Sequence, residues 1–159
     1  MKIYLASSWR NTHYETVLQI LQDAGYYVYD FRNPNNLTDG FKWKETGFEP
    51  PMAVADYLIA LTHPRAVEAL TLDRAALDEC DVLVCLLPCG RSAHLELGYA
   101  IGRGKKTLIY THDNEEPELM AAMADDIVGS PVDMVDVLSR WEPDFWPPYK
   151  RAEVQPLFR

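Results

Sequence analysis

The sequence has 159 residues, a length that suits a single globular domain with one hydrophobic core. Apolar residues make up 48% of it, and its net charge of −9 argues against non-specific binding to nucleic acid or to an anionic membrane, although not against a small anionic ligand. No apolar stretch approaches the roughly 20 residues of a membrane span, and the opening MKIYLASS is too short for the apolar part of a secretory leader.

The first part of the chain alternates between strand and helix patterns. The apolar run Lys2–Ala6 predicts a strand, and residues 11–25 place apolar side chains at helical spacing before a glycine that ends the helix. Aromatic and β-branched residues predict a second strand over Tyr26–Phe31. Residues 32–52 are rich in Asn, Pro, Gly and aromatic residues and predict one long loop, which in a compact domain is commonly functional or disordered.

The middle of the chain contains the most apolar strand pattern. Residues 52–80 have a helical pattern in two pieces, of which the second begins at Pro64. The continuous apolar run Asp81–Pro88 is typical of a central parallel strand that is buried on both faces. A helix over Ser92–Gly102 and a strand over Lys106–Thr111 are predicted to follow.

The last part of the chain predicts two helices, a short strand and a tail. The helices span Pro117–Ala124 and Pro131–Trp141, and residues 126–129 form the strand between them. Residues 142–159 hold four of the eleven prolines. We therefore expect one domain over residues 1–141 and an irregular Pro-rich C-terminal tail over residues 142–159.

Regular alternation of strands and helices predicts a Rossmann-like (flavodoxin-like) α/β sandwich of three layers, with a parallel sheet of about five strands. Sheets of this type bind ligands beyond the carboxyl ends of their strands. Three loops are therefore expected to converge: Ser7–Asn11 after the first strand, the region after Asp30, and Pro88–Glu96 after the central strand.

Glu96 is the acidic side chain of the third loop, and the pattern places it in the first turn of a helix. The helix dipole favours an ionised carboxylate there by roughly 0.3–1 kcal/mol. An ionised carboxylate that faces a cleft can act as a nucleophile or stabilise a cationic transition state. The alternative is that Glu96 only complements the dipole of an exposed helix, and the residue types by themselves leave both interpretations open.

Two of the three loops offer hydrogen-bond donors to an anion. Gly90, Arg91 and Ser92 supply backbone N–H groups, a guanidinium and a hydroxyl at a helix start, where a plain serine cap is the alternative. Ser8 and Arg10 supply a similar set after the first strand. Together they suggest a ligand with an anionic part.

Aromatic side chains near the same loops suggest that the ligand also has an aromatic part. Trp9 offers a flat stacking surface beside the first anion-binding loop. Phe31, Phe41 and Trp43 can add aromatic walls to a pocket, although such residues also serve simply to anchor a loop.

The remaining reactive residue types do not form a recognised motif. Cys80, Cys85 and Cys89 are odd in number and lack CxxC spacing, which predicts reduced thiols in a cytoplasmic protein. The histidines show no metal-ligand spacing, and the glycines from Gly98 onward do not form GxGxxG before a helix. We expect no metal and no organic cofactor.

Three stretches of the sequence together support a resemblance to a known protein family. They are KIYLASSWR at residues 2–10, DRAALDECD leading into VLVCLLP at residues 73–88, and HLELGYAIGRGK at residues 94–105. On these stretches the chain resembles, over roughly residues 2–128, the nucleoside 2-deoxyribosyltransferase family and the related 2-deoxynucleoside 5′-monophosphate N-glycosidases. The resemblance implies an enzyme that cleaves or exchanges the N-glycosidic bond of a 2-deoxynucleoside or its 5′-monophosphate, with Glu96 attacking C1′ to form a deoxyribosyl–enzyme ester.

The resemblance implies roles for four further residues. Tyr4 matches a tyrosine that orients the glutamate, Trp9 matches an aromatic residue of the base pocket, and Asp73 matches an aspartate of the site. Met120 matches a residue that a neighbouring subunit contributes, which implies a homo-oligomer, a dimer or larger.

Departures from the family pattern leave the type of reaction open. The position six residues before the glutamate is an aspartate in the transferases and a phosphate-binding serine in the hydrolases, and it is Gly90 here. Ser8 and Arg10, in contrast, resemble the phosphate-side loop of the hydrolases. Transfer or hydrolysis, and nucleoside or 5′-monophosphate, therefore both remain possible.

The implied chemistry requires a proton for the departing base, and other functions compete with it. Asp73 or Asp30 can supply this proton if burial raises its pKa. A non-catalytic nucleotide-binding module that holds phosphate with Ser8, Arg10 and Ser92 is the main alternative, and a glycosidase acting on a larger nucleotide such as NAD is a weaker one. The expected partner is in each case a small molecule, and not a nucleic acid or a membrane.

Overall fold

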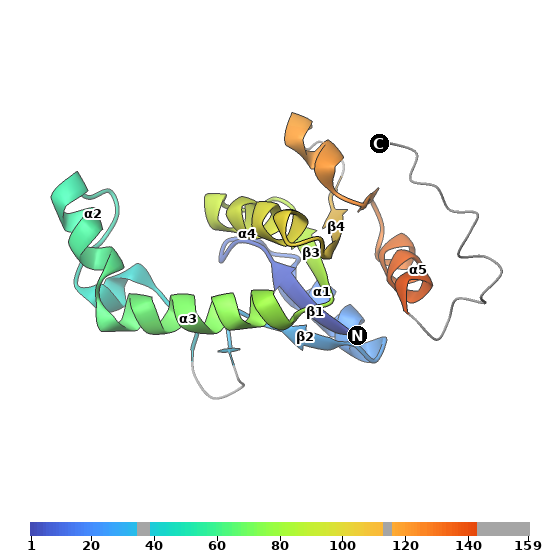
Figure 1. Ribbon diagram of the computed structural model, residues 1–159, viewed down its shortest axis with the longest axis horizontal. Coiled ribbons are helices and arrows are strands. Elements are labelled where there is room, and N and C mark those ends of the chain that lie inside the picture. The colour runs from blue at the N-terminus through green and yellow to red at the C-terminus, as the bar shows by residue number, and fades with distance from the viewer. Residues whose placement is uncertain (35–38, 113–115, 143–159) are drawn as a thin grey trace.

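The computed structural model describes residues 1–34, 39–112 and 116–142 of the chain. At its centre lies a five-stranded parallel sheet with the strand order β2-β1-β3-β4-β5 (Figure 1). The strands are β1 (Lys2–Ala6), β2 (Tyr27–Tyr29), β3 (Val82–Leu86), β4 (Lys106–Tyr110) and β5 (Asp126–Val128). Because the order reverses between β1 and β3, the loops after these two strands lead to opposite faces of the sheet.

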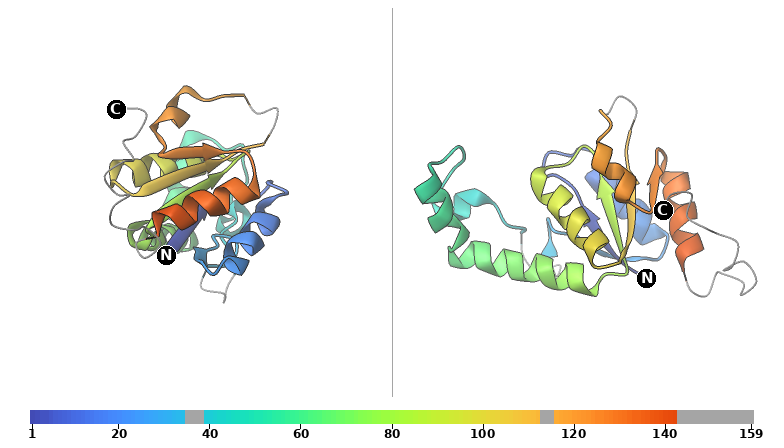
Figure 2. Two further views of the ribbon diagram at one scale, coloured as in Figure 1. Left: turned by 90° about the vertical axis from the view of Figure 1, so that its right-hand side faces the viewer. Right: turned by 45° about the horizontal axis from the view of Figure 1, so that its top comes forward.

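Helices cover both faces of the sheet, which gives the three layers (Figures 1 and 2). The α-helices are α1 (Tyr14–Asp23), α2 (Val54–Leu61), α3 (Pro64–Glu79), α4 (Arg91–Gly102) and α5 (Pro131–Trp141). Two short 3₁₀ helices, η2 (Trp43–Thr46) and η3 (Leu119–Met123), complete the secondary structure discussed below. The predicted flavodoxin-like sandwich with a parallel sheet of five strands is confirmed.

Alternating side chains of the strands divide the core into two layers. On β1, Ile3 and Leu5 pack with the helices α1 and α5, whereas Tyr4 and Ala6 pack with α3 and α4. All five residues of β3 are buried, as the continuous apolar run predicts for a strand covered on both faces. Tyr4 therefore points into the same layer as α4, the helix that carries Glu96.

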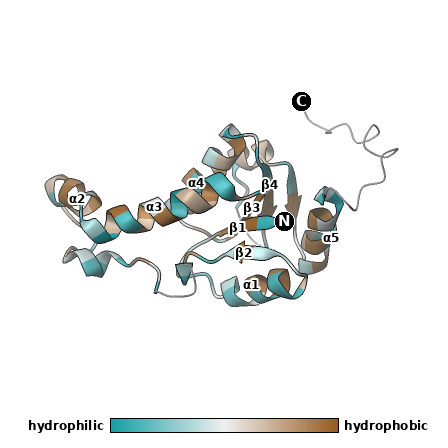
Figure 3. Ribbon diagram, turned by 60° about the horizontal axis from the view of Figure 1, so that its bottom comes forward, coloured by the Kyte–Doolittle hydropathy of each residue, from teal (hydrophilic) through white to brown (hydrophobic). Residues whose placement is uncertain are grey.

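The segment formed by η2, α2 and the first half of α3 projects from the sandwich as an arm (Figures 1 and 2). The helix α2 is apolar, yet Ala60 is its only buried residue. Figure 3 shows this apolar character as brown ribbon at the far end of the arm. No helix of the described segments is long and apolar enough to cross a membrane.

Several predicted element bounds need correction. The second strand is shorter than Tyr26–Phe31, because Asp30 and Phe31 already belong to the following turn. The loop predicted over residues 32–52 contains η2 where it is described, and the helix predicted over Pro117–Ala124 is a 3₁₀ helix. Of the predicted tail, all residues but Glu142 lie outside the described part of the chain.

Candidate active site

Glu96 lies in the second turn of α4, because this helix begins at Arg91. The prediction that it occupies the first turn is therefore wrong by one turn. Leu97 and Ala93 of the same helix are buried against the sheet, and this packing fixes the rotation of α4 about its axis. The Glu96 side chain is half-buried and does not extend freely into solvent.

Two stacked tyrosines and an aspartate lie beside Glu96. The Tyr4 and Tyr29 rings, on the neighbouring strands β1 and β2, stack with their centroids 5.2 Å apart. The Tyr29 hydroxyl donates a hydrogen bond to Asp73 Oδ1 at 2.8 Å, which joins β2 to α3. Four elements thus contribute Glu96, Asp73, Tyr4 and Tyr29 to one site between α3, α4 and the sheet.

The surroundings of Glu96 raise its pKa to about 7. Burial is the largest cause, because it penalises the charged form, and the negative charge of Asp73 is the second. The helix dipole, which favours the ionised form, therefore does not set the pKa of Glu96. In the second turn the dipole effect is already weak, and desolvation together with a like charge outweighs it.

Tyr4 opposes part of this rise, since its hydroxyl interacts with the Glu96 carboxyl and lowers the glutamate pKa. The same hydroxyl is fully buried and makes no hydrogen bond of strict geometry within the described ranges, so the contact with Glu96 is long or poorly aligned. Such contacts in an unliganded site can tighten when substrate binds.

Asp73 also holds its proton more strongly than an exposed aspartate. Burial raises its pKa, and the hydrogen bond from Tyr29 opposes the rise. The condition that we set for Asp73 as a proton donor, a pKa raised by burial, is met. Two neighbouring carboxyls that repel each other titrate as a pair.

Asp30, the other candidate proton donor, belongs to a different environment. Its Oδ1 accepts hydrogen bonds from the Tyr14 hydroxyl at 2.7 Å and from the Arg32 backbone N–H at 2.9 Å. Tyr14 is part of the core layer of α1, on the opposite face of the sheet from Asp73. The structure therefore pairs Asp30 with Tyr14 and Arg32, and within the Glu96 site its charge acts on Tyr29.

The loop after β1 is fastened to the end of β3. Ser7 and the buried Asn11 both donate side-chain hydrogen bonds to the Leu86 carbonyl, at 2.9 and 3.4 Å. Arg32 donates from its guanidinium to the Ser8 carbonyl at 2.7 Å. Neither Asn11 nor Arg32 was predicted from the residue pattern, in which the only signal for them was the density of polar residues in SSWRN and DFRN.

Ser8 and Arg10 remain on the surface of this loop. The Ser8 hydroxyl accepts a hydrogen bond from the Arg10 backbone N–H at 3.2 Å, which stabilises the turn, and the Arg10 side chain is exposed. At the start of α4, Gly90 is the N-cap in an extended conformation with no side-chain cap. Arg91 and Ser92 follow it and are exposed, so both predicted anion-binding segments are accessible.

Gly90 leaves room for a larger residue. A Cβ atom at this position would have no neighbour within 4 Å, and its φ of −93° suits any residue. The departure from the Asp or Ser expected here is therefore not forced by packing.

Aromatic residues gather beside the loop after β1. Trp9 is 43% exposed and meets Phe31 edge-on with a centroid distance of 5.5 Å. Lys42 Nζ lies 5.1 Å from the Trp9 ring, and the neighbouring Trp43 packs edge-on against Phe41 at 5.0 Å. Trp9, Phe31 and the segment 41–43 are thus brought together, and Lys42 is a cation at this wall that was not predicted from the residue pattern.

Met120, the residue expected from a neighbouring subunit, lies in η3 and is 65% exposed. A position in the core of its own chain, one of the alternatives for this residue type, is excluded by that exposure.

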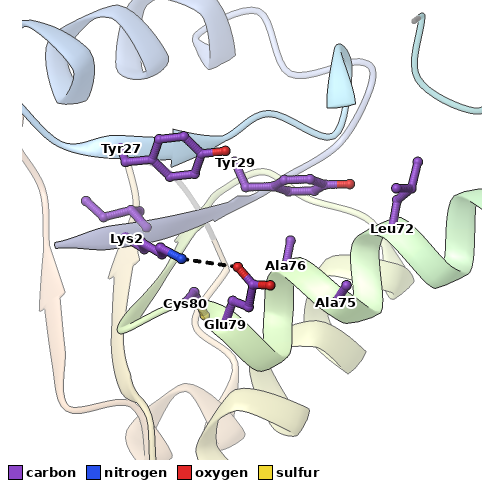
Figure 4. A pocket seen from close by; sticks show the side chains of 9 residues that line it. Lys2, Tyr27, Tyr29, Leu72, Ala75, Ala76, Glu79 and Cys80 are labelled. Carbon is purple, nitrogen blue, oxygen red and sulfur yellow. Dashed lines mark hydrogen bonds and ion pairs between the residues drawn. The ribbon is translucent and has the colours of Figure 1, made fainter. Parts of the chain in front are cut away.

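Two hollows of the described residues lie outside the Glu96 site. A groove of about 130 Å³ runs between β2 and α3, with the Lys2–Glu79 ion pair at one end and the Tyr29 ring in its wall (Figure 4). Among the described side chains, no group of three His, Cys, Asp or Glu residues is placed to hold a metal ion. The concentration of perturbed carboxyls at Glu96 and Asp73, and not the size of a hollow, therefore selects the candidate site.

Comparison with known proteins shows the fold of this chain and does not show its family. No protein-family model matches the sequence, and no curated protein matches it significantly. Among solved structures, the 2-deoxyribosyltransferase of Bacillus psychrosaccharolyticus is 19% identical, with a TM-score of 0.59 over 86% of this chain and 91% of that one. A conserved protein from Enterococcus faecalis V583 is 16% identical, with a TM-score of 0.55 over 88% and 98%.

The Clostridium botulinum CMP N-glycosidase BcmB is also similar, at 16% identity over 87% of this chain and 99% of that one, but its TM-score of 0.48 is too low to support a conclusion. The chain has the flavodoxin-like α/β fold of the 2-deoxyribosyltransferase.

Proposed function

We propose that this protein cleaves or exchanges the N-glycosidic bond of a 2-deoxynucleoside or its 5′-monophosphate, with Glu96 as the nucleophile. The observation that carries the proposal is the pair of half-buried carboxyls, Glu96 and Asp73, beside the buried Tyr4 hydroxyl. The fold shared with a 2-deoxyribosyltransferase supports the same chemistry.

A displacement at C1′ needs a nucleophile and a proton donor, and the two carboxyls can supply one each. Because the negative charge of Asp73 raises the cost of ionising Glu96, the two carboxyls titrate as a coupled pair. With the charge on Glu96 and the proton on Asp73, Glu96 attacks C1′ while Asp73 donates its proton to the departing base. The oxocarbenium-like transition state is stabilised by the adjacent carboxylate and collapses to an ester.

Completion of the cycle determines the type of reaction. Water attacks the ester in a hydrolase, and a second base attacks it in a transferase, and in both cases Glu96 is released. Asp73 then accepts the proton that it gave in the first half. We place a 5′-phosphate at the half-buried Ser8 with the exposed Arg10 and at the exposed segment Gly90–Ser92, and we place the base at the wall formed by Trp9 and Phe31.

We further propose that the active form is a homo-oligomer in which Met120 lies at the site of a neighbouring copy. Two features support this: the exposure of Met120 and the exposed apolar surface of α2. In a monomer both apolar surfaces would face water, whereas exposed apolar patches commonly mark a contact with another chain.

The test is the release of free base from a panel of deoxynucleosides, their 5′-monophosphates and NAD, followed by chromatography. We expect release from at least one deoxy compound and at least a 10³-fold loss in Glu96→Gln. Glu79→Gln is the matched control, since Glu79 forms only an exposed ion pair with Lys2 and should retain activity.

A 2-deoxy-2-fluoro nucleoside should slow the second step and leave a glycosyl adduct on the peptide that contains Glu96, seen by mass spectrometry. Absence of base release from every compound, or an adduct on another residue, contradicts the proposal. If Glu96→Gln binds nucleotide normally and the wild type shows no turnover, the protein is instead a nucleotide-binding module.

A further inference from the structure

Two cysteines meet at the end of β3, beside the proposed site. Cys85 is fully buried within β3, and Cys89 is partly exposed in the loop that leads to α4. Their Sγ atoms are 3.7 Å apart. His94, in the first turn of α4, places Nδ1 3.4 Å from Cys89 Sγ and 3.0 Å from the Gly90 carbonyl oxygen.

These contacts determine which atoms carry protons. A carbonyl oxygen can only accept a hydrogen bond, so the contact with Gly90 requires the proton on His94 Nδ1. Cys89 Sγ lies beside that same N–H and is in the position of an acceptor. The hydrogen bond with Cys89 and, after it, burial raise the pKa of Cys85, so Cys85 keeps its proton and donates toward Cys89.

The sulfur of Cys89 therefore faces two donors, which is an arrangement that favours a thiolate. Cys89 also immediately precedes Gly90, the N-cap of α4, so the positive end of the helix dipole adds to this effect. Thiolates and not thiols react with peroxides and disulfides.

We propose that Cys89 and Cys85 form a reversible disulfide that responds to hydroperoxides and controls the position of Glu96. The Cys89 thiolate first attacks hydrogen peroxide, which with one proton gives a sulfenic acid and water. The Cys85 sulfur then attacks the sulfenic sulfur as its proton passes to the departing hydroxide, which gives the disulfide and a second water. The two sulfurs together lose two electrons, and the peroxide is reduced by two electrons.

The third cysteine is not part of this reaction. Cys80 is buried, and its thiol donates to the Leu77 carbonyl at 3.3 Å, at the opposite end of β3 from Cys89. A disulfide requires an S–S distance of about 2.05 Å, so Cys85 and Cys89 must close from 3.7 Å. Because Cys85 is fixed in the central strand, Cys89 has to make this movement.

The movement of Cys89 affects Glu96, and this part of the inference rests on the proposed function. Cys89 is joined directly to the N-cap of α4, and the charge of Cys89 acts on the Glu96 carboxyl. Drawing Cys89 toward β3 removes its contact with His94 and shifts the start of the helix that carries Glu96. A displacement of about 1 Å at a reacting group can lower a rate by about 100-fold.

The first experiment identifies the bond. The purified full chain is treated with a small excess of hydrogen peroxide, denatured, alkylated and analysed by mass spectrometry. We expect one of its three cysteines to be alkylated and the peptides of Cys85 and Cys89 to be linked, with two hydrogens lost and restored by dithiothreitol.

Matched variants make this result specific. Cys80→Ser should still form the bond, and Cys89→Ser should not. In Cys85→Ala the sulfenic acid on Cys89 has no partner and should be trapped by dimedone, which should not label the wild type. Three free thiols after treatment, a link to Cys80, or a link between chains would overturn the assignment.

The second experiment measures the effect on the site. Amide hydrogen exchange should change in residues 86–96 on oxidation and revert on reduction, whether or not a substrate is known. At about pH 8.5, where Glu96 with its pKa of about 7 is ionised in both forms, we expect oxidation to lower kcat for base release at least tenfold.

The outcomes separate the two proposals. A mapped disulfide with unchanged hydrogen exchange and unchanged kcat would overturn the control of Glu96. A mapped disulfide with changed exchange, in a reduced protein that releases no base, would support the switch and contradict the proposed reaction.

Discussion

At the scale of single residues, the chemistry of the site depends on two acids whose pKa values are raised by burial. Glu96 and Asp73 come from different helices, and each is desolvated in the layer between α3, α4 and the sheet. Such a site costs the folded protein stability, because ionising a buried carboxyl is unfavourable.

That cost gives a prediction for Glu96→Gln. The pKa of Glu96 rises from 4.5 to about 7 on folding, so between these values the folded chain keeps a proton that the unfolded chain has lost. Stability due to this group therefore falls as the pH rises from 4.5, and the full loss is reached above about 7. Glu96→Gln should raise the free energy of unfolding by about 1–3 kcal/mol at about pH 8 and not at about pH 4.

Urea denaturation at the two pH values measures this difference. The exposed Glu79→Gln serves as a control and should show no such gain at about pH 8. An equal effect of Glu96→Gln at both pH values would mean that burial does not perturb its titration.

Asp73→Asn should move the pH dependence of the reaction. The negative charge of Asp73 raises the pKa of Glu96, so its removal should shift the acid limb of kcat/KM to lower pH. The loss of the proton donor should also lower kcat by about 10²–10⁴-fold. A full pH profile with one substrate checks both effects, and a limb that moves to higher pH would refute the proposed pairing.

Tyr4→Phe should move the same limb in the opposite direction. The Tyr4 hydroxyl lowers the pKa of Glu96, and without it the nucleophile ionises only at higher pH. Tyr29→Phe, which removes the hydrogen bond to Asp73 instead, is the companion variant. If the Tyr4→Phe profile superimposes on that of the wild type, Tyr4 does not act on Glu96.

At the scale of secondary structure elements, the exposure of the apolar helix α2 is not explained by the fold of a single chain. Most of its apolar side chains face solvent, including Leu58 at 59% and Ile59 at 58% exposure. A short helix that is apolar on nearly all sides is normally buried. In the proposed homo-oligomer we expect α2 to lie at a contact between copies.

Replacing Leu58 and Ile59 together by glutamate should weaken that contact. We expect the variant to elute later than the wild type in size-exclusion chromatography with light scattering, at the mass of a single chain. Its circular dichroism should be unchanged, because neither side chain packs in the core. Val132→Glu on α5, at a position that is 77% exposed, is the control and should keep the wild-type mass. A wild type that is already monomeric would contradict the prediction.

At the scale of the whole molecule, the proposed homo-oligomer combines residues of two copies in one site. Glu96 lies in the layer between α3, α4 and the sheet, whereas Met120 is exposed on η3. If a neighbouring copy contributes Met120, the two residues of one working site come from different chains.

Mixing two inactive variants tests this arrangement. Glu96→Gln and Met120→Asp should each be inactive, the second because it buries a charge in the neighbour's site. After subunit exchange of a dimer, half of the molecules are mixed and each has one intact site, so roughly a quarter of the wild-type activity should return. Activity that stays at the level of the separate variants would place Met120 outside the neighbour's site.

The sequence alone was sufficient for the architecture. The continuous apolar run before Pro88 predicted the buried central strand, and Pro64 marked the start of α3. These signals are local, since the pattern of polar and apolar residues reflects only which faces of an element are buried. The same local pattern singled out Glu96, a lone acid in a small-residue and apolar segment.

Tertiary structure alone decided the state of that acid. The pKa of Glu96 depends on burial and on Asp73 and Tyr4, which belong to other elements, and these effects outweigh the local effect of the helix dipole. In the same way, no local pattern could select Tyr29 as the partner of Asp73, or bring Cys89 against Cys85 and His94. Charge and desolvation act through space, so their effect is determined only when the chain has folded.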